Sequence, residues 1–343
     1  MAATAYLSQV SNFLTRYGMS TYVALGNLGN ILTIIVFAQR DQRRNPCPLY
    51  LLAMTICNLI CLDVGIIPII FSLDHIDIST EFLVSCKLQF YIRHASFQIM
   101  RTYKVYACID RYALSSMSVR IRAFSQYKVA TRLIIVGGLF WGLLCIFFGM
   151  VRTIENNSCS IHDDTYAMIY TIYYMIFAGI LPPFFIMLFS ILMMRNLKQM
   201  RSRIQPTREA IESGQPTQIL RKRDRDLMKM VLIEVMFYVI STMPFSIYLV
   251  YKLITDDYVK SKDQKQIETF INYMAQSFMM YFNTALPFYI YVATSPSFRR
   301  QLKMIFIKFY AYMTGKQIRT IDAVQSTSAT AIQPVYALTT KRN

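Results

Sequence analysis

Long stretches almost without charge recur along this chain of 343 residues. Six of them cover residues 19–39, 45–73, 133–151, 165–194, 230–251 and 269–298. An apolar helix of about 20 residues spans the hydrocarbon core of a bilayer. Because no water is available there, each backbone N–H and C=O must bond within the protein, and a separate segment of this length can do so only as a helix. The sequence therefore predicts an all-α integral membrane protein.

A seventh segment, residues 82–112, is apolar in outline but contains charged side chains. Charges at membrane depth face the interior of a bundle or pair with one another, so we count this segment as a span too. The composition agrees, because 55% of the residues are hydrophobic and only 16% are charged, which is unusual for a soluble chain. We expect a seven-helix transmembrane bundle. The charged residues of the seventh segment are Lys87, Arg93, Arg101, Lys104, Asp110 and Arg111.

Basic residues gather on one side of the predicted bundle. Most of the 36 Lys and Arg residues lie in the loops near Arg40 and Arg120, in residues 195–225 and in the tail from Arg299. Since cytoplasmic loops carry the excess of Lys and Arg, we expect a plasma-membrane protein with the N-terminus outside and the C-terminus in the cytosol. The net charge of +17 would then face anionic lipid, and nucleic acid is not expected as a partner.

Four parts follow along the chain. Residues 1–18 are predicted to be a short extracellular segment, and residues 19–298 the transmembrane domain. Residues 299–310 have the pattern of an amphipathic helix on the membrane surface. Residues 311–343 are rich in Ser, Thr and Ala, which predicts a disordered cytoplasmic tail. A cleaved signal peptide is not expected, because no basic region with an apolar core precedes the first span.

Short motifs mark several spans. The third span ends in Asp110-Arg111-Tyr112, roughly 38 Å of helix beyond Cys86. The first contains Gly29-Asn30, the second reads YLLAMTICNL over residues 50–59, and the seventh reads NTALPFYIY over residues 283–291. Over roughly residues 19–308 these motifs resemble the rhodopsin-like G-protein-coupled receptors, and within that family the invertebrate neuropeptide receptors of FMRFamide type.

The resemblance implies a receptor, without enzymatic activity or cofactor, that binds an extracellular ligand and activates a heterotrimeric G protein. Arrestin is a further partner that it leaves open. Cys86 and Cys159 would form a disulfide that holds the loop after the fourth span over the ligand entrance. Arg111 would be the switch residue, held in the inactive state by carboxylates until the G protein binds. The implied switch consists of Asp110, Arg111, Tyr112, Asp224 and Tyr291.

Other residues match or depart from the family pattern. Asn58 stands where the family usually has a sodium-binding Asp, and an amide is the weaker cation ligand. Ser241-Thr242-Met243-Pro244 stands where a Trp is expected before the proline, so the hinge remains without its Trp. Pro287 replaces the second Asn of the seventh-span motif. The hinge and core residues implied by the resemblance are Pro244, Pro183, Trp141, Asn30, Asn58, Asn283 and Pro287.

Lys104 and Glu234 fall where the family has apolar side chains in contact above the switch arginine. Charges are costly inside a membrane protein unless they are paired. We therefore hypothesise a buried ion pair between Lys104 and Glu234 that restrains the sixth span. The alternative is that the two side chains face a water-filled cavity and are solvated separately.

The expected ligand pocket lies in the outer half of the bundle. Arg93, about two turns inward of Cys86, stands where amine receptors carry an Asp, which favours a carboxylate or carbonyl-rich ligand unless Asp63 neutralises it. Gln98, Tyr273 and Tyr281 complete the expected pocket. Acidic outer loops favour a short basic neuropeptide, although a solvated loop surface has the same composition. The alternatives are a chemosensory receptor for a small molecule and, in a different class, a seven-helix transporter.

The sequence also bears on glycosylation and metal binding. Asn156-Asn157-Ser158 is an N-glycosylation sequon in a loop expected outside the cell, so Asn156 is the predicted acceptor. The three histidines have no spacing typical of metal ligands, and no metal site is expected.

Overall fold

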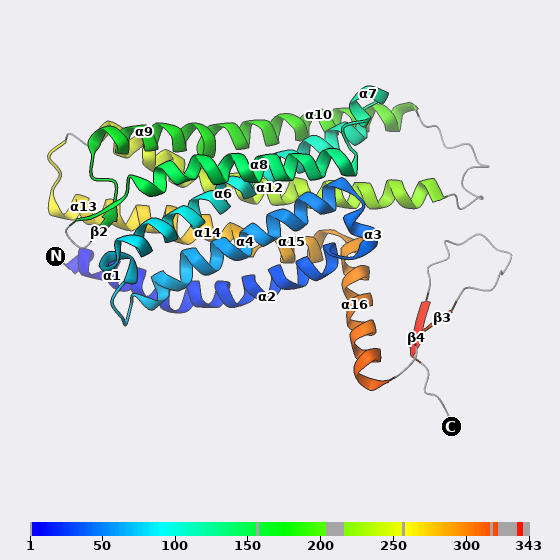
Figure 1. Cartoon of the computed structure of the whole chain (residues 1–343), viewed down its shortest axis with the longest axis horizontal. Helices are drawn as coiled ribbons and strands as arrows, with labels where there is room; N and C mark the ends of the chain where they lie inside the picture. Colours follow the sequence, from blue (N-terminus) through cyan, green and yellow to red (C-terminus); the bar gives the residue numbers. More distant parts are fainter. Residues whose placement is uncertain are drawn as a thin grey trace.

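The computed structural model describes residues 2–155, 158–203, 216–255, 258–315, 318–321 and 335–338. Long helices run side by side along one axis, and a single helix near the C-terminus, α16, leaves the bundle at a steep angle (Figure 1). Together with the apolar sequence, this arrangement confirms the predicted all-α membrane bundle.

The helices alternate with short connections along the chain. In the first half they are α1 (Ala2–Phe13), η1 (Leu14–Met19), α2 (Ser20–Phe37), α3 (Arg40–Arg43), α4 (Pro46–Phe71), α5 (Ile78–Glu81), α6 (Leu83–Ser115), α7 (Val119–Arg122) and α8 (Tyr127–Met150). In the second half they are α9 (Asp164–Tyr174), η2 (Met175–Ile180), α10 (Leu181–Arg203), α12 (Pro216–Thr255), α13 (Lys262–Asn272), η3 (Tyr273–Met279), α14 (Met280–Ala285), α15 (Pro287–Thr294) and α16 (Pro296–Thr314). The η segments are π-helical turns that continue the neighbouring α-helices.

Five helical stretches in the described part of the chain are long and apolar enough to cross a membrane. They are Tyr6–Phe37, Pro46–Phe71, Tyr127–Met150, Asp164–Asn196 and Lys229–Thr255. The two other predicted spans are α6, which carries the internal charges, and residues 269–298, whose helix is interrupted at Leu286, directly before Pro287. Both stretches lie within the bundle beside the apolar spans (Figure 1).

The first helix begins earlier than the sequence suggests. Helix α1 starts at Ala2 and continues through η1 into α2, so residues predicted to form a short extracellular segment are helical. The extra turns pack against α13. The Thr15 hydroxyl lies 2.8 Å from the Tyr273 hydroxyl at this contact. A helical partner at the outer end of the seventh span therefore extends the first helix beyond its most apolar residues.

Helix α6 is the central element of the bundle. It packs against α4, α8 and α10. Its charged residues face this interior: Arg101 and Lys104 are each 2% exposed, Asp110 is 5% exposed and Arg111 is 3% exposed. Positions 93, 97, 101 and 104 recur at the helical period, so these side chains lie along one face of α6. The buried face of α6 thus places these charged side chains inside the bundle.

Prolines lie within the fifth and the sixth span. The π-helical η2 lies directly before Pro182 and Pro183 of α10, and Pro244 lies inside α12. The hydroxyls of Ser241 and Thr242 both donate to the Tyr238 carbonyl, at 3.0 and 2.8 Å. Hydroxyl groups that bond back to a carbonyl one turn earlier bend a helix, as does the missing N–H of proline. The outer half of α12 therefore contains two features that favour a bend.

The chain after the bundle is more ordered than the sequence predicts. Helix α16 runs from Pro296 to Thr314, longer than the expected range 299–310, and ends at Gly315 in the left-handed conformation with φ 65°. Beyond it, β3 (Ile318–Ile321) pairs antiparallel with β4 (Val335–Leu338), within the stretch expected to be disordered.

Candidate functional site

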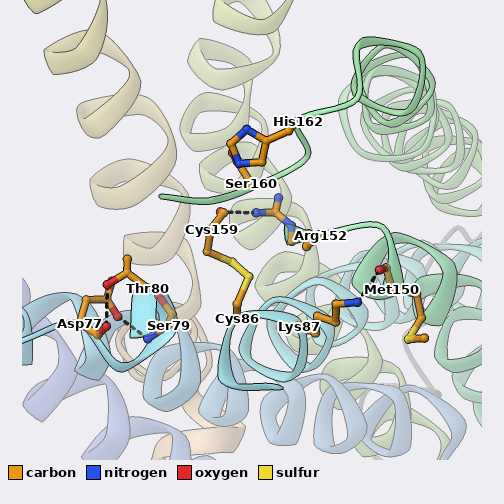
Figure 2. Close-up of a disulfide and its surroundings, with 10 residues drawn as sticks. All are labelled: Asp77, Ser79, Thr80, Cys86, Lys87, Met150, Arg152, Cys159, Ser160 and His162. Carbon is orange, nitrogen blue, oxygen red and sulfur yellow. Dashed lines mark hydrogen bonds between the residues drawn. A yellow bond between two sulfur atoms is a disulfide. The ribbon is translucent and has the colours of Figure 1, made fainter. Parts of the chain in front are cut away.

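A disulfide closes the end of the bundle that the sequence assigns to the outside. Strands β1 (Thr153–Glu155) and β2 (Ser158–Ser160) form a short antiparallel pair, and Cys159 of β2 is bonded to Cys86 near the start of α6. Figure 2 shows Arg152 beside this bond, donating to the Cys159 carbonyl at 2.9 Å. Lys87, also in Figure 2, donates to the Met150 carbonyl at 2.9 Å. The disulfide therefore fastens the hairpin to α6, and Lys87 joins α6 to the end of α8.

Two arginines flank the same aromatic ring beneath the hairpin. The guanidinium carbon of Arg152 lies 3.6 Å from the centroid of the Phe90 ring, and that of Arg93 lies 5.8 Å from it. The side chain of Arg93 also interacts with the Tyr281 side chain. Asp63, the carboxylate that the sequence offers as a partner for Arg93, instead accepts a hydrogen bond of 2.6 Å from Asn27. Within the described residues no ion pair joins Arg93 to Asp63.

Tyr281 fits because the facing residue on α4 is a glycine. A Cβ atom at Gly65 would overlap the Tyr281 ring. Tyr281 is 2% exposed, and its ring contacts Phe97 at a centroid distance of 5.0 Å. Tyr273, which the sequence assigns to the same pocket, lies instead against the first helix, where its hydroxyl donates to the Ser11 carbonyl at 3.1 Å. The structure therefore corrects the expected position of Tyr273.

Arg101 lies deeper, between four spans. Its guanidinium donates to Gln98 Oε1 at 3.1 Å and to the Tyr174 hydroxyl at 2.9 Å, and it lies 3.5 Å from the Met280 sulfur. It also stacks 5.3 Å from the Phe97 ring centroid. Among the described residues all its partners are neutral, and its Nε atom has no hydrogen-bond partner.

An aromatic shell surrounds this arginine. The Tyr173 hydroxyl accepts from Gln98 Nε2 at 2.8 Å and lies 3.2 Å from His94 Nε2. The Tyr173 ring stacks on Phe148 with centroids 4.3 Å apart. Trp141 packs edge-on against Tyr173 and donates to the Thr102 hydroxyl at 2.6 Å. The Trp141 indole of the fourth span and the Tyr173 hydroxyl of the fifth span therefore connect these spans to α6 by hydrogen bonds between neutral groups.

Lys104 and Glu234 meet one turn further inward. Lys104 Nζ lies 3.1 Å from Glu234 Oε1, and the two side chains are 3% and 2% exposed. Neither atom meets hydrogen-bond geometry, so the contact is held by charge alone. The other oxygen, Glu234 Oε2, accepts a hydrogen bond of 2.6 Å from the Tyr291 hydroxyl. The Lys104 ammonium also lies 4.8 Å from the Tyr238 ring centroid. These contacts connect α6, α12 and α15.

Arg111 and Asp110 form a second buried pair near the other end of α6. Arg111 donates to Asp110 Oδ2 through NH2 at 2.6 Å and through Nε at 3.1 Å. Asp110 Oδ1 accepts a further hydrogen bond of 2.7 Å from Ser125 in the following loop. Tyr112 packs on Phe189 of α10 with ring centroids 5.6 Å apart. Asp224 belongs to α12, and its side chain lies outside what the structure describes.

Buried amides occupy the space between the first, second and seventh spans. Asn30 donates to the Thr284 carbonyl at 3.2 Å. Both amide atoms of Asn58, and the nitrogen of Asn283, have no hydrogen-bond partner in the described chain. Pro287 separates α14 from α15 next to this cluster. No group of three or more His, Cys, Asp or Glu residues among the described residues has metal-binding geometry.

Several functional contacts were not foreseen from the sequence. The partnership of Tyr291 with Glu234, the hydroxyl of Ser125 on Asp110 and the Met280 sulfur beside Arg101 depend on how helices are rotated against one another. The one available signal was the helical period that places Arg93, Arg101 and Lys104 on one face of α6. Asn156, the predicted glycosylation site, lies outside the described residues.

The comparisons with known proteins agree with this geometry at the level of the family. No curated protein matches the chain. The model of the family described as 7 transmembrane receptor (rhodopsin family) matches residues 29–291, which include the disulfide, both buried ion pairs and the Arg101 shell. That family consists of receptors rather than enzymes. The chain belongs to the seven-transmembrane receptors of the rhodopsin family.

Proposed function

We propose that the chain is a plasma-membrane receptor that binds an extracellular peptide and activates a heterotrimeric G protein. The observation that carries this proposal is the pair of Arg111 with Asp110 near the end of α6 opposite the disulfide. An arginine held by a neighbouring carboxylate can be released when a partner supplies better contacts. Ligand binding at one end of the bundle can then bias a helix rearrangement at the other.

The moving element in this proposal is α12. Pro244 gives it a hinge, and the contacts of Glu234 with Lys104 and Tyr291 restrain its inner half against α6 and α15. A ligand that favours outward movement of α12 would break these contacts and expose the surface around Arg111. A G protein that binds this surface would stabilise the same state.

The proposed orientation places the disulfide-bonded hairpin outside the cell and α16 on the inner membrane surface. In support, α16 leaves the bundle at a steep angle (Figure 1) and exposes large apolar side chains suited to contact with lipid. Phe298 at its start is 2% exposed and packs on Phe37 and Tyr291, which fixes the helix to the bundle. The exposed residues of α16 include Phe306, Phe309, Tyr310, Tyr312 and Met313.

A peptide is the proposed ligand because acidic residues gather in the outer connections. Some of these have structural partners, since Asp77 and Asp163 cap α5 and α9, and Glu268 binds Lys260. The remaining carboxylates, among them Asp164 and Asp263, would attract a basic peptide segment. Glycosylation of Asn156 is proposed on the same outer side.

The test is G-protein activation in cells that express the chain, challenged with a panel of neuropeptides that includes RFamide peptides. Arg111→Ala is the matched control, and surface expression of both proteins is measured with an antibody to an N-terminal tag. We expect a peptide to activate the wild-type receptor and to fail with Arg111→Ala at equal surface expression. Equal activation of both proteins would refute the switch, and silence with every G protein would refute the peptide-receptor proposal.

A further inference from the structure

Three arginines in the outer half of the bundle have no matching anion among the described residues, and of these Arg101 is buried while Arg93 and Arg152 are partly exposed. Among the described residues, Arg93, Arg101 and Arg152 take part in no ion pair. This differs from the inner half, where Lys104 and Arg111 each contact a carboxylate. The protein therefore neutralises these two inner cations with carboxylates and leaves the three arginines to neutral partners.

Arg101 is the extreme case. It is 2% exposed, its donors reach neutral groups such as Gln98 and Tyr174, and its Nε atom has no hydrogen-bond partner in the described chain. Burial of an uncompensated charge destabilises a protein, and neutral acceptors offset only part of that cost. A residue retained at such a cost is expected to serve a ligand rather than the fold.

Arg152 shows the same imbalance closer to the surface. Burial, together with the nearby Arg93 charge, lowers the pKa of Arg152 to about 10, even though Tyr170 partly opposes the shift. Its Nε atom has no partner in the described chain. An anion bound here would supply the missing opposite charge and return the pKa to its usual range.

We propose that Arg101 binds the carboxylate of the receptor's ligand, that Arg93 and Arg152 attract this anion at the outer level, and that the surrounding aromatic rings contact an apolar body of the ligand. The inference rests on the proposed receptor function, since it names the chemistry of the ligand that the pocket takes. It concerns binding alone and can fail while G-protein coupling through Arg111 stands.

The geometry favours a carboxylate over a more highly charged group. Arg101 lies eight residues after Arg93, roughly 12 Å further along α6, so the cations form two levels and do not converge on one point. One planar guanidinium matches one carboxylate through two parallel hydrogen bonds. The upper pair around Phe90 lies closer to the hairpin than Arg101 does, where its charge would attract an anion that enters from that end.

The side chains around Arg101 indicate which group should accompany the carboxylate of the ligand. Phe97 and Tyr174 flank the guanidinium of Arg101, each with its ring centroid 5.3 Å from the guanidinium carbon, and the Met280 sulfur lies 3.2 Å from the Tyr174 hydroxyl. Tyr173 and His94 continue this surface. A carboxylate on an aliphatic or aromatic body satisfies both the charge and the rings. A peptide with a free C-terminus and a small hydrophobic acid share this chemistry.

The first experiment needs no ligand. The full-length receptor, purified in detergent, is unfolded by heat as the wild type, as Arg101→Met and as Lys104→Met. Both substitutions replace a buried cation on the same face of α6 with an apolar side chain of similar length. We expect Arg101→Met to raise the melting temperature, because it removes an uncompensated charge, and Lys104→Met to lower it, because it leaves Glu234 unpaired. A fall with Arg101→Met matching that of Lys104→Met would make Arg101 structural and overturn the proposal.

The second experiment uses matched acids and amides on the same proteins. One pair is 4-phenylbutyrate and 4-phenylbutyramide, and the other is N-acetyl-Leu-Phe as the free acid and as the C-terminal amide. We expect at least one acid to stabilise the wild type with an apparent affinity about tenfold higher than its amide. The difference should disappear in Arg101→Met, or in Arg101→Gln if the methionine variant does not fold.

The pattern of stabilisation identifies the source of the carboxylate. An effect confined to the peptide acid assigns the site to a peptide C-terminus, and an effect of both acids assigns it to a small organic acid. Equal effects of acid and amide in both pairs, or an acid preference that persists without Arg101, would overturn the proposal. G-protein activation with Arg111→Ala as control reports separately on the receptor function, so the two failures are distinguishable.

Discussion

The buried contact between Lys104 and Glu234 leads to a quantitative prediction. The two side chains are 3% and 2% exposed and their charged atoms lie 3.1 Å apart. Removal of one partner from such a pair leaves an uncompensated charge and costs about 3–5 kcal/mol, whereas replacement of both by apolar residues is nearly neutral. We therefore expect Lys104→Met and Glu234→Met each to be strongly destabilising, and the double variant to unfold close to the wild type.

The coupling energy in this cycle follows from the same figures. If each single change costs about 3–5 kcal/mol and the double change costs little, the two effects fail to add by about 6–10 kcal/mol. Glu234→Met also removes the acceptor of the Tyr291 hydroxyl, so it should cost more than Lys104→Met. Tyr291→Phe removes that hydrogen bond alone and serves as the control, with an expected cost of about 1.5–3 kcal/mol because the acceptor is charged.

Two assays measure the effects of the single and double substitutions of Lys104 and Glu234. Heat or denaturant unfolding of the purified receptor gives the coupling energy, and basal G-protein activation in cells gives the effect on the proposed restraint of α12. We expect basal activity to rise in both single variants, because about 1.4 kcal/mol shifts a two-state equilibrium tenfold. Additive effects of the two single changes on stability would refute the reasoning, since they would mean that each charge is solvated separately.

Three other predictions concern single positions. Gly65→Ala should destabilise the receptor by about 1–3 kcal/mol, since a Cβ there overlaps the Tyr281 ring. Thermal unfolding of Gly65→Ala, alone and combined with Tyr281→Ala, checks this. If Tyr281→Ala does not reduce the loss of stability caused by Gly65→Ala, the prediction is contradicted. Cys159→Ser removes the disulfide and should cost about 2–5 kcal/mol, so the variant should melt as the reduced wild type does. Hydrogen bonds from the Lys260 ammonium and the Tyr251 hydroxyl hold the pKa of Glu268 below its usual range. The ionised Glu268 should therefore stabilise the receptor fully at pH values above the ordinary Glu pKa, and this stabilisation should be lost as the pH falls through the lowered pKa. Glu268→Gln should remove this acid dependence, and an unchanged pH profile in that variant would contradict the assignment.

Much of the arrangement followed from local features of the sequence. The number and extent of the spans could be predicted because a bilayer requires each helix to satisfy its own backbone and to show lipid an apolar surface. The early start of the first helix could not, since contacts of Thr15 and Ser11 with Tyr273 extend it, and those residues lie at opposite ends of the bundle domain in sequence. The helix that follows the bundle was predicted from its amphipathic pattern, but its end depends on Gly315 and its left-handed backbone.

The candidate site also has features that the sequence predicts and features that depend on the tertiary structure. The sequence alone indicated that the charges of the third span would face the bundle interior, because charges at membrane depth avoid lipid. The resemblance to the receptor family placed Lys104 and Glu234 at one depth. Only the tertiary structure decided the partners: Asp63 is bound to Asn27 rather than to Arg93, Tyr291 bonds Glu234, and Arg101 is surrounded by neutral groups. The physical reason is that the partners of a side chain across a bundle depend on the rotation and spacing of neighbouring helices. Residues such as Gly65 and Tyr281 set that spacing by packing, and the pattern along one helix does not reveal it.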